Sequence, residues 1–132
     1  MTKQDLKQYI WIQRNIEKLE QRIEELHAIA TRQTTFPKTD ADAIHGTGYQ
    51  DRQGEVLAEL VDLQRELEEQ LQKAFQIQLA IEKAIERLPE REKYLIRARY
   101  IEGKTWEQIA VDMGYAWAQV HRVHAKALKM LT

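Results

Sequence analysis

The last part of the chain, residues 117–131, carries side chains that could bind an anionic polymer. Side chains able to donate hydrogen bonds or to neutralise phosphates recur there: Gln119, His121, Arg122, Lys126 and Lys129. In proteins that bind nucleic acids, such groups contact base edges and backbone phosphates. No acidic residue follows Asp112, so no carboxylate in this stretch competes for the cations. The chemistry we expect is therefore recognition of phosphates and bases.

The charge of the 132 residues is distributed unevenly. Residues 1–88 hold 12 basic and 16 acidic side chains, and residues 89–132 hold 8 basic and 5 acidic ones. The net charge of −1 thus conceals a cationic C-terminal part on an acidic remainder. A local positive balance favours a local anionic partner.

Several classes of protein are excluded by what the sequence lacks. It has no Cys, no long apolar run, no signal-peptide core, and none of the common catalytic motifs. His121 and His124 are three residues apart, but no third metal ligand lies near them in the sequence. We therefore expect no enzyme activity, no catalytic residue, no cofactor, no metal and no membrane association.

Two long helices are predicted to precede this part, over residues 3–33 and 52–88. The first lacks Gly and Pro, and its apolar positions follow alternating steps of three and four. These positions are Tyr9, Ile12, Ile16, Leu19, Ile23, Leu26 and Ala30. A loop rich in Thr, Asp and Gly is expected at about residues 34–51. The two helices are predicted to form an antiparallel hairpin with coiled-coil packing, as a domain over residues 1–88.

The second helix has more apolar surface than one partner helix covers. Its predicted seam is Leu60, Gln64, Leu67, Leu71, Ala74, Gln78, Ile81, Ile85 and Leu88. Further apolar side chains widen the stripe: Val56, Leu57, Leu63, Phe75 and Ile77. Either the C-terminal part covers the spare face, or a second copy of the chain does. Stripe width favours self-association, and we expect a homo-oligomer, a dimer or larger.

Three short helices are predicted in the C-terminal domain, residues 89–132. The first runs to about Glu102 and Gly103 ends it. The second runs from about Trp106 to Met113, with Thr105 and Gln108 spaced as a capping box. The last runs from about residue 116 to 130. A fold of this kind is all-α throughout.

The second and third of these helices have helix-turn-helix spacing. Gly114 supplies the positive φ of the turn, and Ala110 allows the helices to cross closely. The apolar positions that bury between them are Ile109, Met113, Tyr115, Val120 and Val123. The opposite face of the last helix, on which we also place His124, can enter the major groove of DNA.

A specific resemblance covers the last third of the chain. The stretch "LPEREKYLIRARYIEGKTWEQIAVDMGYAWAQVHRVHAKALKML" resembles region 4 of bacterial sigma-70 factors. The chain as a whole is similar to small phage and prophage proteins grouped with RinA- and ArpU-type late transcription regulators. The resemblance implies a DNA-binding transcriptional role in the cytoplasm of a bacterial host cell. It also implies RNA polymerase as a second partner.

The resemblance suggests positions for DNA contacts. At the first motif helix they are Lys104, Thr105, Trp106 and Gln108. At the second they are Trp117, Ala118, Gln119, His121, Arg122, Lys126 and Lys129. Trp117 and Ala118 stand where sigma factors carry Arg and Glu, so we expect the helix not to read a standard −35 element. Two alternatives remain: a packaging protein resembling a small terminase subunit, or a module that binds RNA polymerase.

Overall fold

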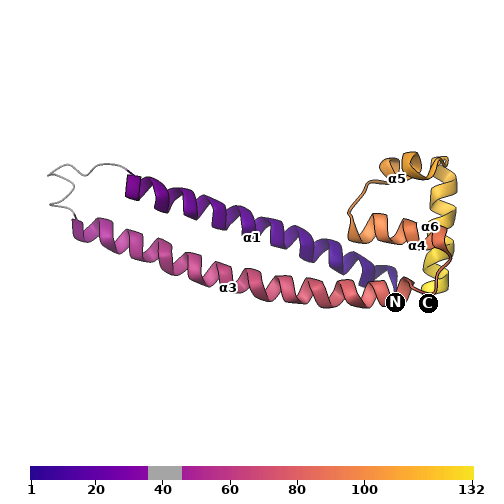
Figure 1. Cartoon of the computed structure of the whole chain (residues 1–132), viewed down its shortest axis with the longest axis horizontal. Coiled ribbons are helices and arrows are strands. Elements are labelled where there is room, and N and C mark those ends of the chain that lie inside the picture. Colours follow the sequence, from indigo (N-terminus) through magenta and orange to yellow (C-terminus); the bar gives the residue numbers. More distant parts are fainter. Residues whose placement is uncertain (36–45) are drawn as a thin grey trace. The chain divides into compact units, whose positions relative to one another are not determined.

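The computed structural model describes the backbone of residues 1–35 and 46–132 and the side chains of residues 1–31 and 52–132. All regular secondary structure in these ranges is helical (Figure 1). The elements in chain order are α1 (Lys3–Thr35), α3 (Gly46–Ile85), α4 (Glu90–Ile96), η1 (Arg97–Ile101), α5 (Trp106–Met113) and α6 (Trp117–Leu131). The predicted all-α fold, with long N-terminal helices and a helix-turn-helix C-terminus, is confirmed.

The predicted loop at about residues 34–51 is too long. α1 continues to Thr35 and α3 already begins at Gly46, while residues 36–45 lie outside the described ranges. A glycine in a helix costs only about 1 kcal/mol relative to alanine. The long run of helix-forming residues that follows outweighs this cost, which is why Gly48 and Gly54 do not break α3.

The chain divides by its contacts into two compact units, of which one is Asn15–Leu71. In this unit the second part of α1 and the first part of α3 lie antiparallel (Figure 1). Arg22 donates from Nη2 to Glu59 Oε1 across the pair at 3.1 Å. Ile16, Leu26 and Leu60 are buried and form the apolar side of the contact.

The second unit joins Met1–Arg14 to Gln72–Thr132. The Tyr9 hydroxyl donates to Gln78 Oε1 at 3.3 Å and accepts from Gln13 Nε2 at 2.7 Å. This polar contact fixes the register of α1 against α3 within the unit. The first turns of α1 thus share a compact unit with α4, α5 and α6. An independent domain over residues 89–132 remains a prediction.

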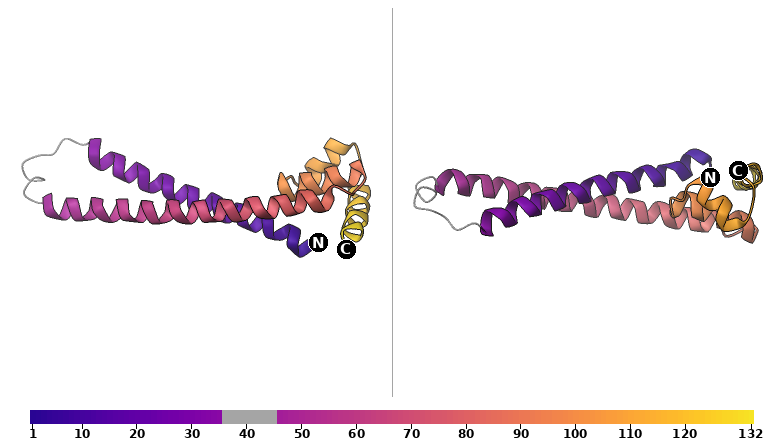
Figure 2. Two further views of the ribbon diagram at one scale, coloured as in Figure 1. Left: turned by 60° about the horizontal axis from the view of Figure 1, so that its bottom comes forward. Right: turned by 90° about the horizontal axis from the view of Figure 1, so that it is seen from above.

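The start of the chain lies against the end of α6 in the same unit. The Met1 ammonium donates to the Leu131 carbonyl oxygen at 3.1 Å, and the N and C marks are adjacent in both views of Figure 2. A positive charge is favourable at the C-terminal end of a helix, where carbonyl groups lack intrahelical partners. The contact ties the last turn of α6 to the first residues of the chain.

The predicted apolar seam of α1 is confirmed, because all seven positions are buried or half-buried. The seam of α3 is only partly correct. Gln64 and Leu71 are exposed, and half-buried Leu63 and Gln70 take their places. Both choices satisfy steps of three and four around Leu67. Each choice places one leucine and one glutamine in the seam, so the pattern of apolar residues alone does not decide between them.

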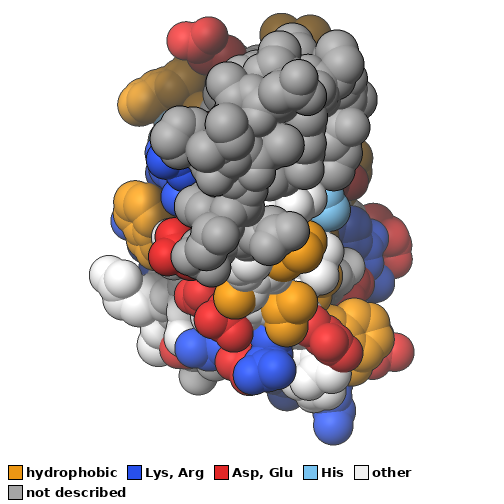
Figure 3. Space-filling model, turned by 90° about the vertical axis from the view of Figure 1, so that its left-hand side faces the viewer, with side chains coloured by type: hydrophobic (Ala, Val, Ile, Leu, Met, Phe, Trp, Pro, Cys, Tyr) orange, Lys and Arg blue, Asp and Glu red, His pale blue; other side chains and the backbone are white. Residues whose placement is uncertain are grey.

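The outer faces of the long helices carry exposed acidic side chains. The exposed acids include Glu24, Glu25, Glu68 and Glu69. Around the grey atoms, Figure 3 shows acidic and basic side chains interspersed with hydrophobic ones on the visible face. In the described part of the chain, no helix is both long and apolar enough to cross a membrane.

The helix predicted to run from residue 89 to about 102 is not regular. After α4 the backbone widens into the π-helical turn η1, in which Glu102 N donates to the Arg97 carbonyl oxygen at 3.0 Å. Leu95 and Tyr100, five residues apart, are both buried as a result. The extra residue in this turn places the Tyr100 ring in the core of the unit.

Candidate nucleic-acid interface

α5 begins with the capping box that the sequence predicts. Gly103 adopts φ 72° and ends the preceding helix. Thr105 Oγ1 accepts from Gln108 N at 3.1 Å, and Gln108 Oε1 accepts from Thr105 N at 2.9 Å. Both side chains are exposed, and the cap uses only their acceptor oxygens. The Thr105 hydroxyl proton and the Gln108 amide NH₂ therefore remain suitable donors to a phosphate.

The turn between α5 and α6 also has the predicted form. Gly114 caps α5 in the left-handed region at φ 69°, and Tyr115 N donates to the Ala110 carbonyl oxygen at 3.0 Å. Ala116 is the N-cap residue of α6 and makes no side-chain cap. The first amides of α6 thus have no side-chain acceptor from the cap position, as expected for alanine there.

Replacing Gly114 with alanine should lower the free energy of unfolding by about 1–2 kcal/mol, because a Cβ disfavours the left-handed conformation. A Cβ at Gly114 would meet no atom within 4 Å, so the cost is conformational. The matched control is Gly54→Ala in α3, which also has open space and should raise stability by about 0.4–1 kcal/mol. Urea unfolding followed by circular dichroism measures both. Equal effects of the two variants would contradict the role of Gly114.

The two motif helices pack through one apolar face, as predicted. Ile109 and Val120 are fully buried and Val123 nearly so. Ala127 and Leu131 continue that face along α6. The opposite face of α6 is exposed and includes Ala118, Arg122, Lys126 and Lys129. The motif thus presents three cations to solvent along one side of its last helix.

Aromatic rings lie close together at the start of α6. Trp117 is 62% exposed, and its ring lies 4.0 Å from the His121 ring, centroid to centroid, at a tilt. His121 in turn lies 4.5 Å from half-buried Trp106 of α5. The Arg99 guanidinium covers Trp106 at 4.5 Å from the ring centroid. Trp106 therefore packs between His121 and Arg99 within the motif, whereas Trp117 faces outward.

The placement of His124 on the DNA-facing side is wrong. His124 is buried, and its Nε2 is hydrogen-bonded to the Tyr100 hydroxyl at 2.7 Å. Burial, followed by the neighbouring charges of Lys3, His121, Arg99 and Lys7, lowers the pKa of His124 to about 4. The ring is therefore neutral at physiological pH. Its position lies on the same helical face as Val120, Val123 and Ala127, which is the signal that could have identified it.

Lys104 is less available for DNA than its position before α5 suggests. Its Nζ donates to Asp112 Oδ2 at 3.0 Å and lies 3.4 Å from Glu102. The hydrogen bond to Asp112 raises the pKa of Lys104 above its ordinary value. Its charge is thus shared with two carboxylates, unlike those of Arg122, Lys126 and Lys129 on α6.

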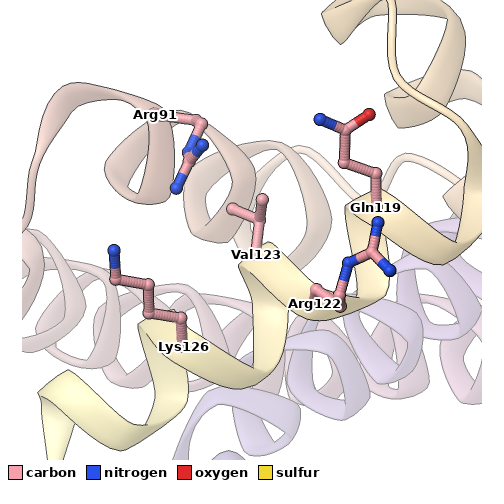
Figure 4. Close-up of a pocket in the computed structure, with 5 residues that line it drawn as sticks. All are labelled: Arg91, Gln119, Arg122, Val123 and Lys126. Carbon is pink, nitrogen blue, oxygen red and sulfur yellow. The ribbon is translucent and has the colours of Figure 1, made fainter.

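A further cation, missed by the sequence analysis, lies next to the exposed face of α6. Arg91 of α4 donates to Glu92 Oε1 at 2.8 Å, and Glu92 is only 1% exposed. Arg91 lines a hollow of about 240 Å³ together with residues of α6 (Figure 4). The lining residues of this α4–α6 hollow are Arg91, Gln119, Arg122, Val123 and Lys126. Sequence alone could not place α4 against this part of α6.

Comparison of the sequence with known protein families gives a match in the same part of the chain. The family model for sigma-70, region 4 matches residues 78–131. The C-terminal part of the chain is similar to sigma-70 region 4. The region 4-like part thus contains the end of α3 and all of α4, η1, α5 and α6. Neither the curated proteins nor the solved structures give a match.

Sigma region 4 is a non-catalytic domain that binds DNA and RNA polymerase. A DNA-binding helix-turn-helix with a regulatory role is therefore the function supported for residues 78–131. Within the described residues, no group of three or more His, Cys, Asp or Glu side chains could hold a metal ion. The DNA contacts of the individual residues named above remain predictions.

Proposed function

We propose that this chain is a phage-type regulator of transcription that docks α6 in the major groove of double-stranded DNA. The observation that carries the proposal is the exposed cationic face of α6, with Arg122, Lys126 and Lys129, on a helix-turn-helix similar to sigma region 4. Such a face neutralises phosphates while the first turns of the helix approach base edges. The proposed place of action is the cytoplasm of a bacterial host cell.

Base reading is assigned to the N-terminal half of α6. Trp117 and Ala118 carry no charged group, so a guanine contact of the sigma type is absent from these two positions. Gln119 can bond adenine, and Arg122 can bond guanine or a phosphate. Trp117, held against His121, offers an apolar ring edge suited to a thymine methyl group. We therefore propose a base preference that differs from the standard −35 element.

The phosphate contacts are assigned to two elements. At the start of α5, Thr105 and Gln108 offer donors beside the cap that they form. On α6, Lys126 and Lys129 extend the cationic face away from the base-reading turns. A duplex held from both helices would be fixed in register before any base is read.

Single substitutions on α6 should separate base reading from phosphate binding. Arg122→Ala is expected to weaken binding by about 1–3 kcal/mol on the preferred sequence and less on others. Lys126→Ala should weaken binding evenly and reduce the slope of log K against log salt by about 0.9. Fluorescence anisotropy on a panel of duplexes from the chain's own genomic neighbourhood measures both effects. Equal losses from Arg122→Ala on every duplex would argue against base reading by this residue.

Binding measurements on the wild-type chain test the broader proposal that it binds DNA. Failure of the folded protein to bind any duplex at low salt would overturn DNA binding. Co-purification with RNA polymerase from nuclease-treated extract would then favour polymerase docking instead. Exposed apolar side chains at Val111 and Trp117, 81% and 62% exposed, offer a surface for such a partner.

We also propose that α3 mediates self-association with a second copy of the chain. Phe75 and Leu79 remain 57% and 49% exposed although they belong to the same compact unit as α4–α6. The C-terminal helices therefore do not cover them. Leu57 and Val61, also on α3, are about half exposed in the other unit. Apolar side chains four residues apart on one helix are suited to helix–helix contact.

The double variant Phe75→Glu/Leu79→Glu is expected to shift the chain toward monomer, because it places charges in the proposed contact. Light scattering coupled to size-exclusion chromatography measures the mass. Glu68→Gln, at an exposed position on the same helix, is the control. A monomeric wild-type chain would contradict self-association, and a large ring would favour the packaging alternative over a dimeric regulator.

A further inference from the structure

The α4–α6 hollow combines cations from two elements around one small space. Arg91 comes from α4, and Gln119, Arg122 and Lys126 come from successive turns of α6. In Figure 4 the side chains of Arg91 and Lys126 point toward one another, and Val123 lies beside the space between them. Val123 is buried and provides an apolar floor. Groups from two helices thus converge on a space of about 240 Å³.

The charge of this hollow distinguishes it from others on the molecule. None of its lining residues is acidic. The hollow between α3 and α4 includes Glu82 and Glu86 beside its cations, and a hollow in the other unit includes Glu66. Glu92 is linked to the α4–α6 hollow through its hydrogen bond from Arg91, yet it is buried and does not line the hollow. Even with Glu92 included, the three cations Arg91, Arg122 and Lys126 give the hollow a net positive charge.

The arginine is held in position by the protein itself. Its hydrogen bond to Glu92, together with the nearby Tyr115 side chain, raises the pKa of Arg91. Burial alone would raise the pKa of Glu92, but the hydrogen bond from Arg91 and the charge of Lys126 keep it below its ordinary value. A guanidinium fixed by one carboxylate loses less side-chain entropy when it binds a second anion. Its remaining N–H groups can donate to that anion.

We propose that the α4–α6 hollow binds a backbone phosphate of duplex DNA between Arg91 and Lys126, with Arg122 at its edge toward the bases. This inference rests on the proposed function and adds a contact from α4. A liquid water molecule occupies about 30 Å³, so the hollow has room for a phosphate group. Arg and Lys around a phosphodiester give the charge-assisted hydrogen bonds that fix a duplex in register.

The test compares two arginines in similar settings. Arg91 pairs with Glu92 and its side chain is 43% exposed, while Arg97 pairs with Glu82 and its side chain is 41% exposed. Arg91→Gln should weaken binding to a mixed-sequence duplex roughly threefold to tenfold and lower the salt slope by about 0.9, equally on all sequences. Arg97→Gln is the matched control and should leave the salt slope unchanged.

A second variant guards against loss of folding. Arg91→Gln uncovers the buried Glu92 carboxylate, so Arg91→Gln/Glu92→Gln replaces the ion pair with two neutral amides. If the single variant loses helicity by circular dichroism, the double variant supplies the measurement. It should show the same reduction in salt slope. An unchanged slope in the folded variant would overturn the inference.

The outcomes separate this inference from the proposed function. If the wild-type chain binds no duplex at low salt, both are overturned. If it binds DNA and responds to Lys126→Ala but not to Arg91→Gln, only the phosphate contact from α4 is wrong. The last experiment measures thermal stability with inorganic phosphate added at matched ionic strength. Phosphate could stabilise the wild-type chain against heat but not the Arg91→Gln variant, while the DNA salt slope stays the same in both. That result would show that the hollow binds free anions and would overturn the assignment to DNA.

Discussion

Replacing Ile109 with alanine is expected to lower the free energy of unfolding by about 2–5 kcal/mol. Ile109 is fully buried where α5 meets α6, together with Val120 and Val123. Removing its side chain loses transfer free energy and leaves a cavity that the packed helices cannot fill. Since the turn at Gly114 fixes α6 only at its start, this contact must also orient the exposed cationic face. DNA binding should fall together with stability.

The control lies on the same helix. Val111, two positions further along, is 81% exposed, so Val111→Ala should change stability by less than about 0.5 kcal/mol. Urea unfolding followed by circular dichroism and by tryptophan fluorescence compares the two variants. A cost below about 1 kcal/mol for Ile109→Ala would mean that the α5–α6 contact is not what holds the motif together.

Acidification from pH 7 to pH 5 is expected to cost roughly 2 kcal/mol of stability through His124 alone. The folded-state pKa of His124 is about 4, below the ordinary value of 6.5. The folded state therefore binds fewer protons than the unfolded state between these values. The stabilisation is complete above about pH 6.5 and is lost as the pH falls toward 4. Protonation would place a charge in the core beside Tyr100, Arg99 and Lys3.

His124→Gln isolates this effect, because glutamine retains a hydrogen-bonding group for Tyr100 but does not titrate. Its stability should change little between pH 7 and pH 5, while the wild-type stability falls. Glu82, whose pKa is lowered chiefly by its hydrogen bond from Arg97, loses its contribution only at more acidic pH. Chemical unfolding at several pH values gives the difference. Parallel pH profiles for the two proteins would refute the assignment to His124.

The local features of the helix-turn-helix could be predicted because each depends on a few neighbouring residues. The capping box requires only Thr105 and Gln108 at the correct spacing, and positive φ at Gly103 and Gly114 follows from the absence of a Cβ. The seam of α1 is equally predictable, because α1 has one apolar stripe and packs it against one helix, α3. Each of these features is stabilised by residues that are close together in the sequence.

Features that depend on tertiary packing could not be predicted in the same way. The polarity of His124 favours the DNA-facing side, although its spacing matches the buried face. Arg91 joins the cations of α6 only because α4 packs against that helix, and no periodicity reports a crossing angle. The helix boundaries at Thr35 and Gly46 do not follow from the sequence, because glycine disfavours a helix without preventing it.

The π-helical turn at Arg97–Ile101 has a consequence for sequence comparison. A turn of this kind holds one residue more than an α-helical turn, as a single-residue insertion would. Buried positions before it, such as Leu95, and after it, such as Tyr100, therefore follow different helical phases. Aligning this helix with a regular one requires a one-residue gap between Ile96 and Tyr100. Without that gap, Arg99 would be matched to a core position and Tyr100 to a solvent-facing one.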